Sequence, residues 1–464
     1  MKNSIFVLSA ATFLAGCTLA PKYEQPAAPV SETWPTRTTP ASATNTAAAL
    51  DWQNFFNDPR LQKLIALALE NNRDLRVAAL RVEETRAQFR IRRSALYPGF
   101  EGIAGGSRQK YSGAVTAFSG GSILTTYNVD IAASYEVDLF GRVRSLKKEA
   151  LERYFATDEA RKSVQIALVS EVATEYLTQL RLLEAKAIAN QTLAAVQESY
   201  NLIKHRFDAG AVSELELRTA EGQIQTVRVN SANFLQLLAE SENALVVLMG
   251  QPLPKDIPAG IPFREQQLLA DLPVGIPSEV LQRRPDILAA EHTLQAANAN
   301  IGAARSAFFP RILLTGSAGT ASAKLSDLFT GPSQTWSFSP QITVPIFEFG
   351  ATQAKLDAAR IATRIEVANY EKAIQNAFRE VADSLAARSI IDEKVEAQKI
   401  LLNAQQKRFD LTYARYRQGV DSYVDVLLAQ QDLYAAQQNL VQYQAARLLN
   451  AVMLYRSLGG GWKS

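Results

Sequence analysis

The sequence has few of the side chains that build catalytic or metal-binding sites. Cys17 is its only cysteine, so no internal disulfide can form. His205 and His292 are its only histidines, and neither has a neighbour at metal-ligand spacing. The chain contains no glycine-rich phosphate loop and no Gly-x-Ser-x-Gly elbow. We therefore expect no enzyme, no metal and no cofactor, and we expect His205 on a helix surface.

A charge excess of one sign is also missing. The chain has 49 basic and 46 acidic residues, a formal net charge of +3, and this balance offers no field that would attract nucleic acid. Beyond the first residues there is no apolar run of 18 residues, and the mean hydropathy is -0.08. These values are typical of a soluble protein. However, apolar and polar residues alternate along the strands of a membrane β-barrel, so a low mean hydropathy does not exclude a barrel protein.

Residues 127–139 alternate strictly between two faces. The odd-numbered positions are aromatic, aliphatic or small, and most even-numbered positions are polar. This period of two predicts a long strand that ends at Phe140-Gly141. Its length suits a tilted strand that crosses a bilayer, with acidic side chains on the face that an aqueous lumen would take.

A very long helix is predicted to follow this strand directly. From Arg142 the apolar period becomes helical, and no proline or glycine interrupts it before Gly210. Over these 69 residues a helix would extend roughly 100 Å. A heptad-like seam and a second apolar stripe at Leu168 and Val172 indicate neighbours on both sides, as in a closed cylinder of helices. The seam consists of Ile166, Val169, Ala173, Tyr176, Leu180, Leu183 and Ala187.

The same plan occurs twice in the chain. An offset of 209 takes Tyr127 to Trp336 and Gly210 to Gly419, and an offset of 212 takes Ser94-Ala-Leu-Tyr-Pro98 to Ser306-Ala-Phe-Phe-Pro310. The chain is therefore interpreted as an internal duplication. The first repeat is 51–250, a proline-rich connector is 251–277, and the second repeat is 278–464. Each repeat is expected to hold a helix, a β-hairpin, a long helix and a shorter return helix.

The N-terminus has the pattern of a bacterial lipoprotein. Residues 1–16 combine a basic start with an apolar stretch, and Leu14-Ala-Gly-Cys17 forms a lipobox. Cleavage before Cys17 would leave this residue first in the chain and free to carry acyl chains, as a palmitate-type membrane anchor. The alternative is an ordinary signal peptide with an incidental cysteine. Residues 17–50 contain five prolines and are interpreted as an extended tether.

Four strands are too few to close a barrel. Two hairpins leave two open edges, and lipid does not tolerate the unpaired backbone groups there. Three copies would share a 12-stranded barrel with an open lumen, whereas two would form a filled barrel of about eight strands. The predicted lipid-facing residues are Tyr127, Val129, Ile131, Tyr135, Trp336, Phe338, Ile342 and Val344. The predicted lumen-facing residues are Asn128, Asp130, Ser134, Ser337 and Thr343. The alternative is that the strand belongs to a soluble β-sandwich, whose strands show the same alternation.

Several motifs together resemble the TolC-type outer membrane factors, in the OprM/NodT-type efflux lipoprotein branch. They are the lipobox, Phe55-Phe-Asn-Asp-Pro-Arg-Leu61, Asn71-Asn-Arg-Asp-Leu-Arg-Val-Ala-Ala79, Glu136-Val-Asp-Leu-Phe-Gly-Arg142, Arg283-Arg-Pro-Asp-Ile287, Ala303-Ala-Arg-Ser-Ala-Phe-Phe-Pro310 and Leu458-Gly-Gly-Gly-Trp462. The resemblance covers essentially the whole mature chain. Thr18 after the cysteine, rather than Asp, resembles lipoproteins that are sorted to the outer membrane.

The resemblance implies an α+β membrane protein. It would be a homotrimer with a 12-stranded outer-membrane β-barrel that is continuous with a 12-helix periplasmic α-barrel. It would dock to a periplasmic membrane-fusion adaptor and an inner-membrane transporter of the resistance-nodulation-division type. The expected function is a passive exit duct for drugs and other toxic small molecules. The alternatives are an outer-membrane duct of type I protein secretion and a purely structural envelope lipoprotein or adhesin.

A periplasmic gate is expected where each long helix turns at Gly210 and Gly419. Four acids follow these turns, and three-fold symmetry would make each of them a ring of carboxylates with raised pKa values. Family members often carry two aspartates in the second turn, but here the second position is Leu428, so an apolar ring with Val424 is expected. Tyr416 and Arg417 are expected to latch the closed state by bonding Glu216 or Asp425 of a neighbouring helix. The acids are Glu214, Glu216, Asp421 and Asp425; the alternative is that they are ordinary solvated charges at helix N-termini.

Overall fold

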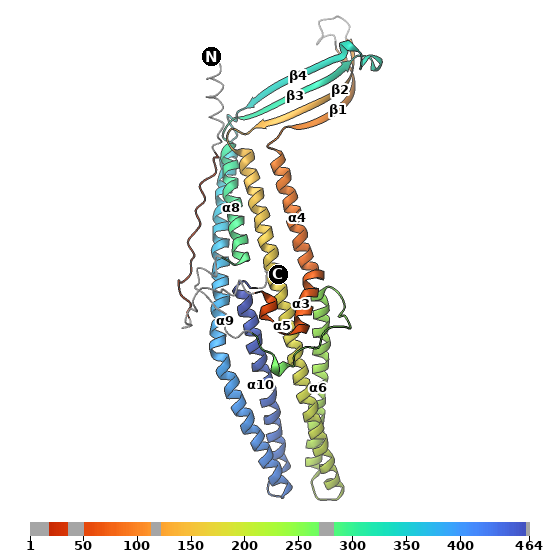
Figure 1. Ribbon diagram of the computed structural model, residues 1–464, viewed down its shortest axis with the longest axis vertical. Helices are drawn as coiled ribbons and strands as arrows, with labels where there is room; N and C mark the ends of the chain where they lie inside the picture. The colour runs from red at the N-terminus through yellow and green to blue at the C-terminus, as the bar shows by residue number, and fades with distance from the viewer. Residues whose placement is uncertain (1–17, 36–50, 113–121, 269–282, 461–464) are drawn as a thin grey trace. The chain divides into compact units, whose positions relative to one another are not determined.

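A computed structural model describes residues 18–35, 51–112, 122–268 and 283–460 (Figure 1). The chain divides into two compact units. The first is made of Arg81–Asp158 and Ala289–Glu371 with the N-terminal residues to Ala27, and the second is made of Ala28–Leu80, Glu159–Leu288 and Lys372–Ser464. The signal region with Cys17 and parts of the connector lie outside the described residues.

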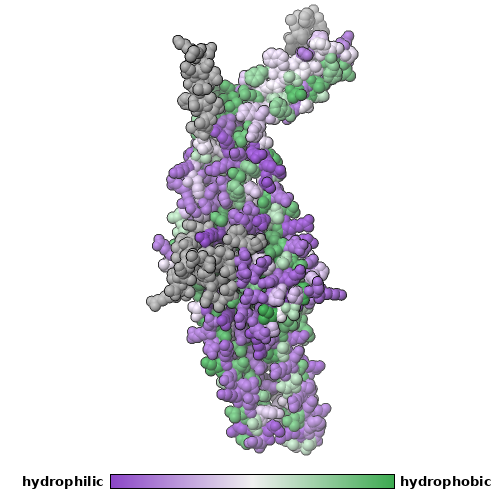
Figure 2. Space-filling model, viewed as in Figure 1, coloured by the Kyte–Doolittle hydropathy of each residue, from purple (hydrophilic) through white to green (hydrophobic). Residues whose placement is uncertain are grey.

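The first unit contains a four-stranded antiparallel sheet in the order β1-β2-β3-β4. In the register, Ile131 of β2 lies between Gly102 of β1 and Ala318 of β3. White and green residues, which are intermediate to hydrophobic, cover much of this sheet in Figure 2, whereas purple residues dominate the helices. The strands are β1 (Gly99–Tyr111), β2 (Ser122–Val137), β3 (Arg311–Ser322) and β4 (Gln334–Thr343).

Two predicted strands end earlier than the alternation suggested. β2 ends at Val137 because Asp138 turns to cap the next helix, where its carboxylate accepts from the backbone N–H of Val143 at 3.1 Å and of Arg144 at 2.9 Å. β4 ends at Thr343, two residues before Pro345, which has no N–H to donate to a ladder. Val344, which was predicted to face lipid, therefore lies one residue outside β4.

The predicted very long helices are confirmed. The helix α5 runs over Arg142–Asp208 and α9 over Ala351–Arg417, each 67 residues long. The other principal helices are α4 (Arg73–Ser94), α6 (Glu214–Met249), α8 (Pro285–Ser306) and α10 (Tyr423–Ser457). Among the described residues, no helix is both long and apolar enough to cross a membrane.

The predicted seam of α5 is right in its first half and wrong in its second. The first four seam side chains are buried, and so are those of the second stripe, but Leu183 is 48% exposed and Ala187 is also exposed. The buried positions have moved to Leu182, Ala185, Ile188 and Ala189. A helix with 3.6 residues per turn drifts away from a strict heptad, so a neighbour is met at shifted positions further along.

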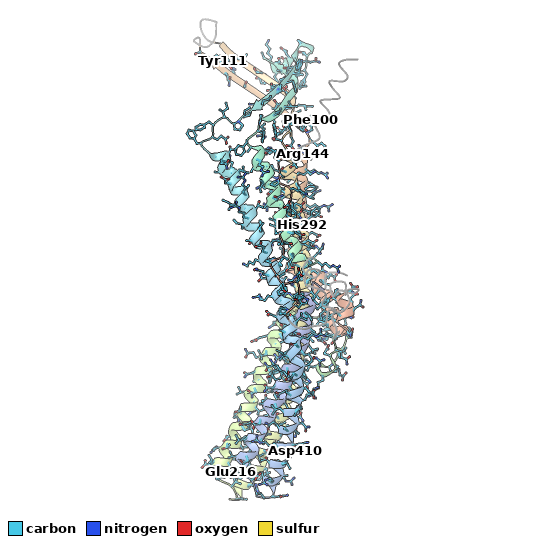
Figure 3. All side chains as sticks on the ribbon, turned by 90° about the vertical axis from the view of Figure 1, so that its left-hand side faces the viewer. Phe100, Tyr111, Arg144, Glu216, His292 and Asp410 are labelled. Carbon is cyan, nitrogen blue, oxygen red and sulfur yellow. The ribbon has the colours of Figure 1, made fainter. Side chains whose placement is uncertain are left out.

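Ion pairs fasten the ends of the strands to the helices of the first unit. The Arg142 guanidinium donates to both oxygens of Glu136 at 2.7 Å, and Arg311 donates to the same carboxylate at 2.8 Å. Deeper in the unit, His292 of α8 lies 2.9 Å from Glu152 of α5, with the Phe155 ring beside it. Figure 3 labels His292 and Arg144 among these side chains. The end of β2 is thereby held to the start of α5 and to the start of β3, and α8 is held to α5.

The N-terminal residues that were predicted as a tether form a strap along α8. The Arg305 guanidinium donates to the carbonyl of Leu19, and the Asn298 amide donates to the carbonyl of Pro21, both at 3.0 Å. The Tyr23 hydroxyl donates to Glu291 at 3.2 Å. The helix partners are seven residues apart, so they share one face of α8. We call residues 18–27 the strap; it is extended, as predicted, but it is docked.

The second unit is built around an aromatic core. Phe55 of α2 (Trp52–Phe55) stacks on Tyr455 of α10 with ring centroids 4.2 Å apart, and both side chains are fully buried. The next helix, α3 (Pro59–Asn71), buries one face against α5 and α6. Two helices stand where the first repeat was expected to hold one, because Asn72 separates α3 from α4: its side chain caps Leu75 and also donates to the carbonyl of Leu248.

Asp58 connects this core to the proline-rich connector. One carboxylate oxygen caps α3 by accepting from the N–H of Arg60 at 2.8 Å. The other accepts from the Tyr176 hydroxyl at 2.8 Å, from the N–H of Ile261 at 3.0 Å and from the Gln266 amide at 2.6 Å. Asp58 is 2% exposed. A single buried carboxylate thus holds three segments of the chain together.

Candidate functional site

The two turns predicted to form a gate have the same backbone geometry. Gly210 and Gly419 adopt φ values of 71° and 77°. At the first turn the N–H of Ala211 donates to the carbonyl of Arg206 at 2.8 Å, and at the second the N–H of Val420 donates to the carbonyl of Arg415 at 3.0 Å. This is the Schellman arrangement, which requires the left-handed conformation that glycine adopts without strain. Glycine is therefore needed at both turns.

Each return helix begins with an equivalent serine cap. The hydroxyl of Ser213 accepts from the N–H of Glu216 at 3.3 Å, and that of Ser422 accepts from the N–H of Asp425 at 3.3 Å. In the second repeat the Asp425 carboxylate also accepts from the N–H of Ser422 at 3.2 Å, which completes a capping box. The hydrogen bonds from Ser422 lower the pKa of Asp425 below its ordinary value.

The four predicted acids have different surroundings within one chain. Asp421 accepts from Arg415 at 2.8 Å, and this hydrogen bond raises the pKa of Arg415. Glu214 forms an exposed pair with Arg218 at 3.3 Å. Asp425 completes the capping box at the start of α10, which agrees with the alternative of charges at helix N-termini. The expectation of raised carboxylate pKa values concerns rings made by several copies, and it stays a prediction.

Tyr416 has a different partner from the one predicted. Within the chain its hydroxyl accepts from the Arg206 guanidinium at 3.0 Å and does not donate to Glu216 or Asp425, and the guanidinium carbon lies 5.3 Å from the ring centroid. The ring is 6% exposed and contacts Tyr423. Tyr416 therefore belongs to a core that joins the two helix turns, and Arg417 is exposed.

Sequence reasoning missed Arg206 and Tyr423. Arg206 has a repeat counterpart in Arg415, and this matched pair of cations in the last helical turn was an available signal. Tyr423 is 2% exposed, and its hydroxyl has no hydrogen-bond partner among the described residues. Burial raises the pKa of Tyr423 to about 12.

Apolar side chains are exposed next to the buried tip core. Val424 and Leu428 of α10 are 46% and 48% exposed, although Tyr423, Val426 and Leu427 beside them are buried. The first two are four residues apart and share one face of the helix. Leu215, the 209-offset counterpart of Val424, is 74% exposed. Both repeats therefore present an apolar residue at the same place in the return helix.

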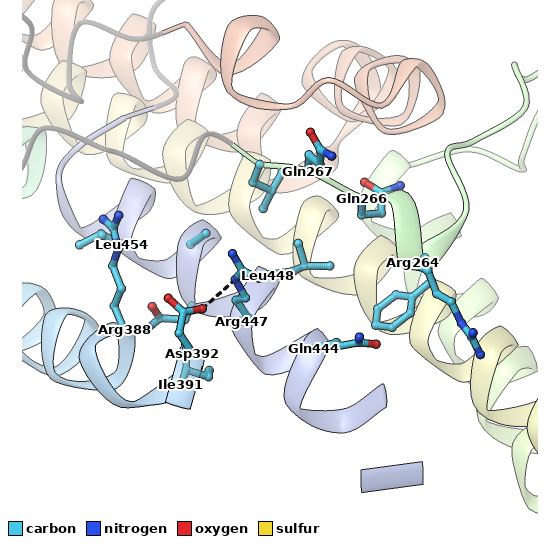
Figure 4. Close-up of a pocket in the computed structure, with 14 residues that line it drawn as sticks. Arg264, Gln266, Gln267, Arg388, Ile391, Asp392, Gln444, Arg447, Leu448 and Leu454 are labelled. Carbon is cyan, nitrogen blue, oxygen red and sulfur yellow. Dashed lines mark ion pairs between the residues drawn. The ribbon is translucent and has the colours of Figure 1, made fainter. Parts of the chain in front are cut away.

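A cavity of about 460 Å³ in the second unit lies among the connector, α9 and α10 (Figure 4). Its charged side chains are paired: Arg447 lies 3.1 Å from Asp392, and Arg264 lies 2.6 Å from Glu184. Among the described residues, no group of three or more His, Cys, Asp or Glu side chains is placed to hold a metal. The described lining of the cavity thus holds no metal centre, and the helix turns remain the candidate site.

A four-stranded sheet combined with two 67-residue helices defines the fold of the TolC-like outer membrane channels. The MtrE outer membrane channel of Neisseria gonorrhoeae, solved in an open state, superposes with a TM-score of 0.87 at 41% identity, over 96% of this chain and 99% of that one. A structure of CusC superposes with a TM-score of 0.85 at 38% identity, over 96% of this chain and 100% of that one.

The sequence comparisons point to the same class of protein. The family model described as outer membrane efflux protein matches residues 64–251 and 276–460. The toluene efflux pump outer membrane protein TtgC of Pseudomonas putida is 44% identical over all of this chain and 96% of that protein. The outer membrane protein OprJ of Pseudomonas aeruginosa is 42% identical over all of this chain and 97% of that protein. The chain belongs to the outer membrane efflux protein family.

This membership settles the broad function. The chain is an outer membrane component of an efflux pump, and its family consists of channels rather than enzymes.

Proposed function

We propose that three copies of this chain form a closed channel, with a 12-stranded β-barrel in the outer membrane and a 12-helix α-barrel in the periplasm. The observation that carries the proposal is the sheet itself, whose order β1-β2-β3-β4 leaves β1 and β4 as edges of a four-stranded sheet. A bilayer has no water to pair the backbone groups of such edges. Pairing β4 of one copy with β1 of the next removes both edges in every copy.

The channel acts as a passive exit duct for drugs and other toxic small molecules. An inner-membrane transporter of the resistance-nodulation-division type supplies them through a periplasmic membrane-fusion adaptor. The similarity to proteins named as toluene and antibiotic efflux components supports this choice of cargo. A type I protein-secretion duct is the second candidate, since it would use the same architecture.

The duct is gated at its periplasmic end by the helix turns after Gly210 and Gly419. The exposed faces of Val424 and Leu428 support an apolar constriction, and Asp425 lies between these residues in the sequence. Asp425→Ala should raise single-channel conductance and weaken block by cations. Tyr416→Phe combined with Arg417→Ser should admit vancomycin. Wild-type conductance, cation block and vancomycin entry in both variants would place the constriction elsewhere.

The chain is anchored by acyl groups on Cys17. Residues 1–16 are the cleaved signal, and 17–50 form the tether that begins with the acylated cysteine. Residues 251–277 connect the two repeats, 51–250 and 278–464. Cys17→Ser behind an ordinary cleavable signal should lose lipid labelling while much of the oligomer persists. An unmodified mature cysteine in the mass spectrum of the wild-type protein would contradict acylation.

One experiment tests the duct as a whole. The full-length protein in a planar bilayer should give discrete channels, and deletion of its gene should sensitise cells to a panel of antibiotics, dyes and detergents. Channels without a change in susceptibility, together with co-purification of a secretion ATPase, would favour protein secretion. Failure to conduct would favour a structural envelope protein.

A further inference from the structure

Three arginines form an exposed row at the end of α4 that leads into the sheet. Arg86, Arg90 and Arg93 are spaced by four and three residues, so they share one face of the helix. The structure exposes all three. No ion pair to any of them exists within the described part of the chain. We call this row the arginine face.

The surroundings of the arginine face are more basic than the chain as a whole. Residues 85–94 hold four arginines and no acid, although the whole chain is almost balanced in charge. At the neighbouring start of α5, by contrast, Arg142 and Arg144 are neutralised by Glu136 and Asp138 at 2.7 and 3.0 Å. Arg142 and Arg144 thus have partners within the unit, whereas among the described residues the cations of the arginine face form no ion pair.

The internal duplication allows the arginine face of α4 to be compared with the equivalent face of α8 in the second repeat. The offset of 212 places Arg86, Arg90 and Arg93 on Asn298, Gly302 and Arg305 of α8. Asn298 and Arg305 donate to the carbonyls of the strap. A side chain at Gly302 would collide with Ala20 of the strap. The strap therefore occupies this face of α8, whereas on α4 the same face carries cations and is uncovered.

Apolar side chains within and after the arginine face are exposed. Ile91, Tyr97 and Phe100 are 68%, 68% and 70% exposed, and Phe100 already belongs to β1, as labelled in Figure 3. Aromatic and aliphatic side chains next to cations are typical of the boundary between hydrocarbon and headgroups. The guanidinium group binds phosphate through two parallel hydrogen bonds, which favours a phosphate ligand over a point anion.

We propose that the arginine face binds the phosphate headgroups of anionic phospholipids in the periplasmic leaflet of the outer membrane. The inference rests on the proposed placement of the sheet in the bilayer. The two repeats then hold the membrane boundary by different means. The second repeat carries the covalently acylated strap, and the first repeat collects anionic lipid at the equivalent position.

The test compares two triple variants of the full-length protein. R86Q/R90Q/R93Q removes the arginine face. R73Q/R76Q/R81Q removes the same charge from exposed positions of the same helix further from the sheet. Each purified protein is mixed with equal amounts of phosphatidylglycerol and phosphatidylethanolamine in detergent, and bound lipid is counted by native mass spectrometry. A parallel sample contains inorganic phosphate.

We expect the wild type and R73Q/R76Q/R81Q to retain phosphatidylglycerol preferentially and R86Q/R90Q/R93Q to lose this preference by roughly tenfold or more. Equal binding by all three proteins, or equal losses in both variants, would overturn the inference. Displacement of the lipid by inorganic phosphate would assign the face to free phosphate instead. Loss of the oligomer in R86Q/R90Q/R93Q alone would assign it to contact between copies.

The same variants separate this inference from the proposed duct. R86Q/R90Q/R93Q should still conduct in a planar bilayer, because the arginine face lies outside the helix turns proposed as the gate. A wild type that binds phosphatidylglycerol but fails to conduct would refute the duct and leave the lipid site standing. A wild type that conducts but shows no preference for phosphatidylglycerol would refute the lipid site and leave the duct standing.

Discussion

The hydroxyl of Tyr416 accepts a hydrogen bond from Arg206 at 3.0 Å, across 210 residues of sequence. This bond joins the end of α9 to the end of α5, so the two repeats are linked at their turns inside one chain. Tyr423 lies against the same ring, but its own hydroxyl is buried without a partner among the described residues. Two buried tyrosines in one core therefore differ in hydrogen bonding: the hydroxyl of Tyr416 has a partner, and that of Tyr423 has none among the described residues.

The two tyrosines give a matched pair of substitutions. Tyr416→Phe removes an accepted hydrogen bond from a cation and should lower the free energy of unfolding by about 1–2 kcal/mol. Tyr423→Phe removes an unsatisfied polar atom and should leave the stability unchanged or raise it slightly. Urea denaturation followed by circular dichroism measures both. A larger loss in Tyr423→Phe than in Tyr416→Phe would contradict this assignment.

The capping box should make the start of α10 sensitive to acid. The pKa of Asp425 is lowered in the folded chain, so its stabilising contribution is present above the ordinary Asp value of 3.8 and is lost as the pH falls through the lowered value. The protection factors of the amides of Ser422 and Asp425, measured against their intrinsic exchange rates, should therefore fall below about pH 4. In Ser422→Ala this acid-dependent step should be smaller. An identical step in that variant would show that the cap is not its source.

The buried carboxylate of Asp58 is expected to be the most sensitive single position in the second unit. Asp58→Asn keeps the size but replaces an acceptor by a donor that faces other donors. We expect a loss of roughly 3 kcal/mol in urea denaturation. Asp256→Asn in the same connector is the control, since Asp256 is exposed and should change stability by less than about 0.5 kcal/mol. Equal effects at the two positions would remove Asp58 from its proposed central role.

The two faces of β2 should respond differently to charge. Ile131 is 64% exposed in the single chain, and an arginine on a lipid face near the midplane costs about 2–4 kcal/mol. Ile131→Arg should therefore reduce the amount of protein in the outer membrane fraction. Ser134→Arg on the predicted lumen face should insert normally. Equal tolerance at both positions would refute the assignment of the faces.

The periodic features were predictable from the sequence because they depend on neighbours in the chain. The alternation around Ile131 predicted β2, and the matched Gly210 and Gly419 predicted the two turns, since each signal lies within a few residues. The strand ends at Asp138 and Pro345 were missed, although capping and proline are local signals that were available.

The remaining features depend on contacts between distant residues, and local patterns do not encode these. Tyr176 fits the helix seam, but nothing near it in the sequence indicates that its hydroxyl meets Asp58. Arg206 has the pattern of an ordinary cation at a helix C-terminus, yet it binds Tyr416. The strap has the composition of a tether, and its docking is decided by Asn298, Gly302 and Arg305 far along the chain. Such pairings follow from the fold and not from periodicity.

The docking of the strap also sets an order of events during folding. Its contacts to Glu291, Asn298 and Arg305 span 268, 277 and 286 residues of sequence. The first residues of the mature chain therefore wait for a helix that lies more than half of the chain further along. Closing so large a loop costs more entropy than any contact within a hairpin. Strap docking is then among the last steps of folding, and a chain released before α8 is complete has no partner for its own N-terminus.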